Sequence, residues 1–176
     1  DGFRILYVHA PSAWMSLFTY IVMALASAIG LIWRMKVAHA VAASCAPIGA
    51  AFTACALVTG AVWGQKMWGT WWVWDARLTS ELILLFLYFG FMALQAAIDD
   101  PRRADKAGAV IALVGVINVP IIYFSVKWWN TLHQGASVSL TKSPSMAATM
   151  LVGMLLMALA FWMYSIAAML MRLRCI

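Results

Sequence analysis

The sequence predicts an all-α integral membrane protein, a polytopic bundle with five transmembrane helices in one domain over residues 1–176. The chain is 65% hydrophobic and only 10% charged, with a mean hydropathy of +0.90. Soluble domains are about half apolar and about a quarter charged. Five apolar runs also reach roughly the 20 residues that a bilayer core requires, which is too long for barrel strands. This composition excludes a soluble enzyme and a disordered chain.

The predicted spans, in chain order, are residues 13–32, 39–62, 78–98, 107–124 and 145–171. Three short connections between or after them, residues 33–38, 99–106 and 172–174, hold seven of the twelve basic residues. Because lysine and arginine concentrate in cytoplasmic loops, we expect these connections in the cytoplasm of a bacterium. Residues 1–12, a Trp-rich loop at 63–77 and a loop at 125–144 would then face the periplasm, across the inner membrane.

The sequence carries no motif for enzymatic chemistry. Three scattered cysteines are too few for a disulfide framework or a zinc site, and there is no CxxC. P-loop, HExxH and GxSxG motifs are also absent from the sequence. We therefore expect a protein that is not an enzyme, with any ATP-driven step supplied by a partner.

Tryptophans are concentrated in the predicted loop 63–77. Half of the ten in the chain lie there, namely Trp63, Trp68, Trp71, Trp72 and Trp74. Trp128 and Trp129 lie in the other predicted periplasmic loop, 125–144. One explanation is an interfacial aromatic belt, in which indole rings lie at the level of the lipid headgroups. The high density of tryptophans favours a second explanation, a flat platform on which a large planar aromatic ligand is held by stacking and apolar burial.

Two of the three histidines fall on the same predicted side as this loop. His9 precedes the first predicted span, His133 lies in the loop 125–144, and His39 falls on the opposite side. Imidazole is a common axial ligand of haem iron. Two axial histidines next to a surface of tryptophan side chains would form a haem pocket. An ordinary pair of histidines at the membrane interface fits the spacing equally well.

Charged residues border the same loop. Asp75 is placed to cap the helix that follows, and we expect Glu81 to lie in its first turn. An ionisable residue this close to the membrane is also a functional candidate, but for Glu81 we favour a structural role. Arg77 can bind a carboxylate such as a haem propionate. Arg4, Lys66 and Lys127 are further cations on that side, and the sequence does not select among the four.

Three segments carry a resemblance to a known family. They are RILYVHAPSAWM around His9, WGTWWVWDARLT from Trp68 to Thr79, and NVPIIYFSVKWWNTLHQG around His133. Together they resemble the tryptophan-rich (WWD) haem-handling membrane proteins of cytochrome c biogenesis, and within them the branch of cytochrome c maturation protein C (CcmC, haem exporter protein C). The stretch SVSLTKSPSM after His133 departs from that pattern and has no expected role.

The resemblance implies six helices, the first of them upstream of Asp1. It implies that haem b is bound non-covalently at the periplasmic face, with His9 and His133 as axial ligands of the iron. The implied cofactor-binding set is His9, His133, Trp68, Gly69, Trp71, Trp72, Trp74, Asp75 and Arg77. It also implies delivery of the haem to the periplasmic haem chaperone CcmE, with the single-span protein CcmD and the ABC transporter subunits CcmA and CcmB as further partners.

Two other functions remain open at this point. A membrane cytochrome b that transfers electrons also uses bis-histidine haem, but such proteins usually bury both ligands within their spans. An apolar scaffold subunit whose tryptophans form only a belt would bind no haem. A haem spectrum separates the scaffold from the other two, and transfer of haem to a chaperone separates delivery from electron transfer.

Overall fold

The computed structural model describes residues 2–133, 138, 143 and 145–175. A short 3-10 helix, η1 (Gly2–Ile5), leads into α1 (Leu6–Trp33), α2 (Lys36–Trp68) and α3 (Ala76–Ala97). α4 (Pro101–Gly115), α5 (Asn118–Trp128) and α6 (Ala148–Leu173) follow, and the described residues form no strand. Within the described residues, five segments are long and apolar enough to cross a membrane, with α4 and α5 together making one of them. The predicted all-α, polytopic fold is confirmed.

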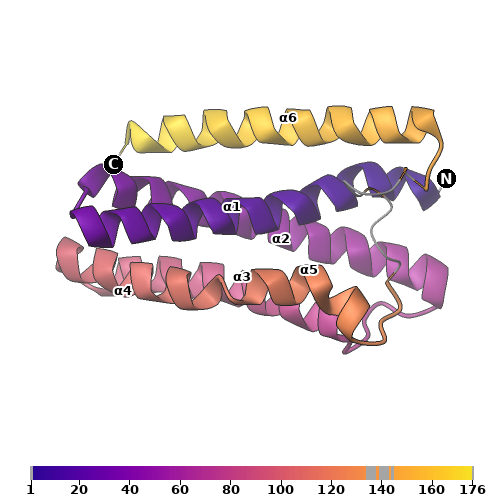
Figure 1. The fold of residues 1–176 in the computed structure, drawn as a ribbon, viewed down its shortest axis with the longest axis horizontal. Coiled ribbons are helices and arrows are strands. Elements are labelled where there is room, and N and C mark those ends of the chain that lie inside the picture. The colour runs from indigo at the N-terminus through magenta and orange to yellow at the C-terminus, as the bar shows by residue number, and fades with distance from the viewer. Residues whose placement is uncertain (1, 134–137, 139–142, 144, 176) are drawn as a thin grey trace.

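The helices form layers around the α1–α2 hairpin (Figure 1). α3, α4 and α5 lie on one side of this hairpin, and α6 lies on the other. The main core is built where α1 and α2 meet α3 and α4, around the fully buried Tyr20, Met23, Leu84 and Tyr88. The hydroxyl group of Tyr88 donates to the backbone oxygen of Ser16 at 2.7 Å, which ties α3 to α1 deep inside the bundle.

Several helices are longer than the hydropathy pattern predicts. α1 begins at Leu6, so His9 lies in its first turn instead of preceding it. α2 continues to Trp68 and ends at Gly69, whose φ of 76° is the left-handed conformation that glycine adopts without strain. The predicted loop 63–77 is therefore wrong in its bounds, because polar residues such as Gln65 and Lys66 remain helical at the end of a membrane span. The non-helical segment is 69–75.

The second predicted loop, 125–144, also starts too early. α5 continues to Trp128, so the connection to α6 begins at Trp129. Residues 134–137, 139–142 and 144 of that loop lie outside the described residues. His133 is described, five residues after the end of α5.

The predicted span 107–124 is interrupted. α4 ends at Gly115 and α5 begins at Asn118, so Val116 and Ile117 separate two helices within one span. Pro120 lacks the N–H that would bond to the carbonyl of Val116 in a continuous helix. The side chain of Asn118 donates to the backbone oxygen of Ser80 at 2.8 Å, which fastens the start of α5 to α3.

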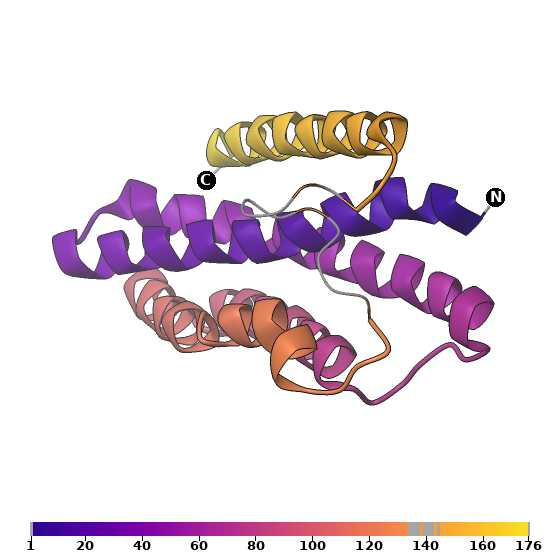
Figure 2. The same ribbon diagram turned by 45° about the vertical axis from the view of Figure 1, so that its right-hand side comes forward.

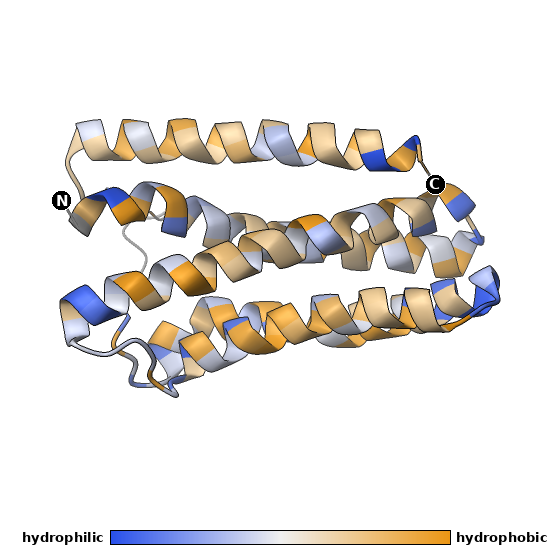
Figure 3. Ribbon diagram, turned by 180° about the vertical axis from the view of Figure 1, so that it is seen from behind, coloured by the Kyte–Doolittle hydropathy of each residue, from blue (hydrophilic) through white to orange (hydrophobic). Residues whose placement is uncertain are grey.

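α6 packs loosely against the rest. Met154 is its one buried residue among those described, and its contacts are with α1 and α2. Figure 2 shows this helix standing apart from the other layers. Hydrophilic residues gather at the end of the bundle that holds the C-terminus, the α1–α2 connection and the α3–α4 connection (Figure 3).

Candidate functional site

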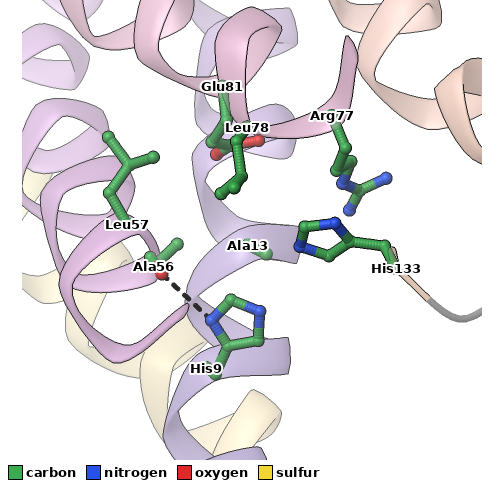
Figure 4. Close-up of a pocket in the computed structure, with 8 residues that line it drawn as sticks. All are labelled: His9, Ala13, Ala56, Leu57, Arg77, Leu78, Glu81 and His133. Carbon is green, nitrogen blue, oxygen red and sulfur yellow. Dashed lines mark hydrogen bonds between the residues drawn. The ribbon is translucent and has the colours of Figure 1, made fainter. Parts of the chain in front are cut away.

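One cavity lies between the ends of α1, α2 and α3 and the segment that follows α5. It is lined by His9, Ala13, Ala56, Leu57, Arg77, Leu78, Glu81 and His133. Figure 4 shows the two imidazole rings at this cavity, with Arg77 reaching from α3 toward His133. Two histidines that are 124 positions apart in the sequence are thus brought to one place, as the haem-pocket hypothesis requires.

α2 fixes the orientation of His9. The Nδ1 atom of His9 lies 3.0 Å from the backbone oxygen of Ala56 and 3.1 Å from Oγ1 of Thr59. A carbonyl oxygen can only accept, so Nδ1 carries the proton, and in the neutral imidazole Nε2 keeps its lone pair. Gly60 makes room for the ring, because a Cβ there would lie 3.0 Å from Cε1 of His9.

His133 is held in the same way by a carboxylate. Its Nδ1 lies 3.2 Å from Oδ2 of Asp75, and its ring meets the ring of Trp68 edge to face at 5.0 Å between centroids. Burial lowers the pKa of His133 below its usual 6.5, outweighing the opposing effect of Asp75, and Arg77 lowers this pKa further. The imidazole is therefore neutral near pH 7, with Nε2 unprotonated.

Asp75 has two roles at once. It caps α3, as predicted, since its Oδ1 accepts from the backbone N–H of Leu78 at 2.8 Å. Its other oxygen accepts from His133. The second contact cannot be read from the sequence, because it joins residues that only the fold brings together.

Of the four candidate cations, Arg77 lines the cavity. Its Nη1 donates to the backbone oxygen of Ile122 on α5 at 2.9 Å. A guanidinium has five N–H donors, so this bond leaves donors for an anionic ligand at the cavity. Lys127 instead lies over the ring of Phe124, 5.6 Å from its centroid, and Lys66 is exposed in the last turn of α2.

Glu81 differs from its expected placement. α3 begins at Ala76, so Glu81 lies beyond the first turn, and the predicted interaction with the helix terminus is wrong. The side chain is buried, accepts a hydrogen bond from Oγ of Ser16 on α1 at 2.7 Å, and borders the cavity. The sequence signal for a functional role of Glu81 is its ionisable side chain inside a predicted membrane span.

The tryptophans of the segment around residues 68–74 fall into two groups. Trp68 and Trp72 are half-buried, and the indole nitrogen of Trp72 is buried with no hydrogen-bond partner among the described residues. Trp71 and Trp74 are 60% and 76% exposed. The ring of Trp74 meets that of Trp72 edge to face at 5.4 Å. The segment thus presents an exposed aromatic surface, and Trp68 connects it to the site through the ring of His133.

The donor groups fit haem iron. Histidines that ligate metals donate their second ring N–H to a carbonyl or carboxylate, and both His9 and His133 do so. The cavity itself measures about 40 Å³, which is room for water but not for a porphyrin. A planar macrocycle fits between the two rings only if they move apart.

Comparison with known proteins agrees with the family that the sequence motifs resemble. The family model described as "Heme exporter protein C" matches residues 1–176. A relative with that name from Haemophilus influenzae is 53% identical over 161 residues, covering 92% of this chain and 65% of the relative. One from Bradyrhizobium diazoefficiens is 55% identical over 158 residues, covering 90% and 60%. One from Escherichia coli is 58% identical over 137 residues, covering 78% and 56%. The chain therefore matches about three fifths of the length of these relatives.

Proposed function

The chain belongs to the haem exporter protein C family, and from this premise we propose that it binds haem between His9 and His133 and delivers it to the haem chaperone CcmE. The haem is haem b, bound non-covalently as cargo for the biogenesis of c-type cytochromes. The protein acts as a transport subunit and not as an enzyme.

One observation carries the proposal. Both histidines at the cavity donate through Nδ1, to Ala56 in one case and to Asp75 in the other. Both Nε2 atoms therefore keep the lone pair that an iron ligand needs. A histidine pair that only anchored the bundle at the membrane interface would not require this shared arrangement.

The surroundings supply the other requirements of a haem site. Arg77 provides donors for a propionate at the cavity. Trp68 packs against the ring of His133, and the exposed Trp71 and Trp74 extend the aromatic surface outward. Apolar burial of the porphyrin against these rings adds to the binding that the two iron bonds give.

The position of the site favours delivery over electron transfer. His9 lies in the first turn of α1, and His133 follows the end of α5, so both are at one end of the bundle. The segments at this end hold five of the twelve basic residues over far more chain than the short connections that hold the other seven. The positive-inside rule therefore directs this end to the periplasmic face of the inner membrane. There a soluble domain of CcmE can reach the haem, while CcmD, CcmA and CcmB assemble around the spans.

The proposal is tested by transfer of haem in a purified system. The full-length protein, loaded with haem, is mixed with CcmE, and covalent haem on CcmE is followed by gel staining and absorbance. We expect transfer from the parent protein and a strong loss for His133→Gly. Stable bis-histidine haem that never passes to CcmE would favour the cytochrome b alternative, and a protein without a haem spectrum would favour the scaffold.

A further inference from the structure

An apolar groove of about 220 Å³ lies between α1, α2 and α6. It is on the opposite side of the α1–α2 hairpin from the cavity of His9 and His133. Its lining includes Met15, Phe18, Val22, Cys45, Trp162 and Met169, and no charged residue among those described. The rings of Phe18 and Trp162 approach to 4.2 Å between centroids, so α1 and α6 touch beside the groove.

The groove accompanies the loose packing of α6. Between helices in a bilayer there is no hydrophobic driving force, so association depends on close packing. Unfilled apolar space forfeits the dispersion contacts of the side chains that line it. An apolar cavity of about 150 Å³ is enough to bind benzene, and the groove is larger than that. Lipid chains are the apolar molecules that surround a membrane helix at the highest concentration.

Basic residues lie at the end of the bundle that holds the α1–α2 connection and the C-terminal end of α6. Arg34 and Lys36 join α1 to α2, Arg172 and Arg174 end α6, and all four are exposed. Figure 3 shows both of these hydrophilic segments at the same end. At about 1.5 Å per helical residue, Met169 is roughly 5 Å from Arg172 along α6, and Cys45 is roughly 14 Å from Lys36 along α2. Half of a hydrocarbon core is about 15 Å thick.

The backbone at Arg34 adds a separate observation. Arg34 ends α1 with a φ of 54°, the one left-handed residue other than glycine among those described. Helices usually place glycine at this position, because a Cβ is disfavoured there. Arg34 is therefore a backbone outlier at the turn between α1 and α2.

We propose that this end of the bundle binds one anionic phospholipid, with an acyl chain in the groove between α1, α2 and α6 and the phosphate against Arg34 and Arg172. Along the three helices, lining residues lie about 5 Å from Arg172 (Met169), about 14 Å from Lys36 (Cys45) and about 18 Å from Arg34 (Val22), distances that one acyl chain of the adjacent leaflet can span. Basic pockets between membrane helices bind anionic headgroups. The lipid would replace the packing that α6 lacks and hold it against α1 and α2.

The alternative explanation is that these basic residues only orient the protein in the membrane. The α3–α4 connection offers an internal control, because Arg102 and Arg103 lie at the same end and no residue of α3 or α4 lines this groove. If orientation were the whole explanation, arginines at the two places would affect lipid binding equally.

The test uses full-length protein stripped of lipid in a mild detergent. Phosphatidylglycerol or phosphatidylethanolamine with identical acyl chains is added back, and bound lipid is counted by native mass spectrometry. We expect one tightly bound phosphatidylglycerol. Arg34→Gln and Arg172→Gln should each weaken it about five-fold, whereas Arg102→Gln and Arg103→Gln should change it little.

A second pair of variants tests the groove. Ser165 lines it and bonds only to Phe161 of its own helix among the described residues, so Ser165→Leu fills space without breaking a contact between helices. This change should weaken both lipids, whereas Ala160→Leu, at an exposed position of α6, should weaken neither. Equal binding of the two lipids, full competition by glycerol phosphate alone, or unchanged binding in Ser165→Leu would overturn the proposal. So would a polypeptide that stays bound in the groove and excludes lipid. None of these outcomes bears on haem transfer to CcmE.

Discussion

Oδ2 of Asp75 accepts a hydrogen bond from Nδ1 of His133 at 3.2 Å, across 58 positions of sequence. The same carboxylate caps α3 through the N–H of Leu78. The start of α3 and the segment after α5 are therefore fixed to each other by one side chain, and the orientation of His133 depends on it.

Asp75→Asn separates the two roles of this residue. Asparagine is as good a helix cap as aspartate, so the thermal stability of the haem-free protein should change little. Loss of the carboxylate beside His133 should weaken haem binding about 10–100-fold, because it removes the charged partner of an iron ligand. Haem titration followed by absorbance measures the effect. Asp75→Ala, which also removes the cap, should in addition lower stability by about 1 kcal/mol.

The axial ligands are tested by His9→Gly and His133→Gly. Each should lower bound haem or change its low-spin spectrum, since the iron loses one of two imidazoles. Imidazole in the buffer should partly restore either variant, because the porphyrin still gains apolar burial. His39→Gly is the matched control, since His39 lies at the far end of α2, packed against Gly30. Identical haem spectra for the parent and both site variants would rule out the assignment.

The aromatic surface is tested by Trp71→Ala and Trp74→Ala. Stacking of a ring contributes about 0.5–1.5 kcal/mol beyond burial, so each change should weaken haem retention by about two- to ten-fold. Trp162→Ala should leave retention unchanged, since that indole packs on Phe18 beside the apolar groove. Equal retention by all three variants would mean that the exposed tryptophans are an interfacial belt.

The orientation in the membrane is tested by fusions of alkaline phosphatase, which is active only in the periplasm. A fusion after Gly69 should be active, and one after Arg103 should be inactive, because basic residues concentrate at the end that holds Arg103. The reverse pattern would place His9 and His133 in the cytoplasm, away from CcmE.

Much of this architecture could be predicted because long apolar runs can only be membrane helices. The helix ends could not, since residues such as Gln65 and Lys66 lower the hydropathy while the helix continues to Gly69. Likewise His9 appeared to precede the first span, although Pro11 lies inside α1. Membrane helices accommodate such prolines when their neighbours supply the missing bonds.

The candidate site could also be predicted only in part. His9, His133 and Arg77 could be selected because few residue types bind iron and carboxylates, and the structure brings them to one cavity. The place of Glu81 depends on Ser16, a residue of another helix that no spacing connects with it. The break between α4 and α5 has a signal in Pro120. Hydropathy does not locate it, since Val116 and Ile117 are as apolar as the helices on either side.

The two predicted iron ligands belong to different helix pairs. His9 is held by α2, while His133 depends on Asp75 at the start of α3, and α5 is joined to α3 through Arg77 and Asn118. Iron bound by both imidazoles would act as a cross-link between these two halves of the bundle. Loading the protein with haem should therefore raise its melting temperature. Breaking either iron bond would remove this cross-link, so a chaperone that supplies one competing ligand would loosen the haem site while the core still joins the helices.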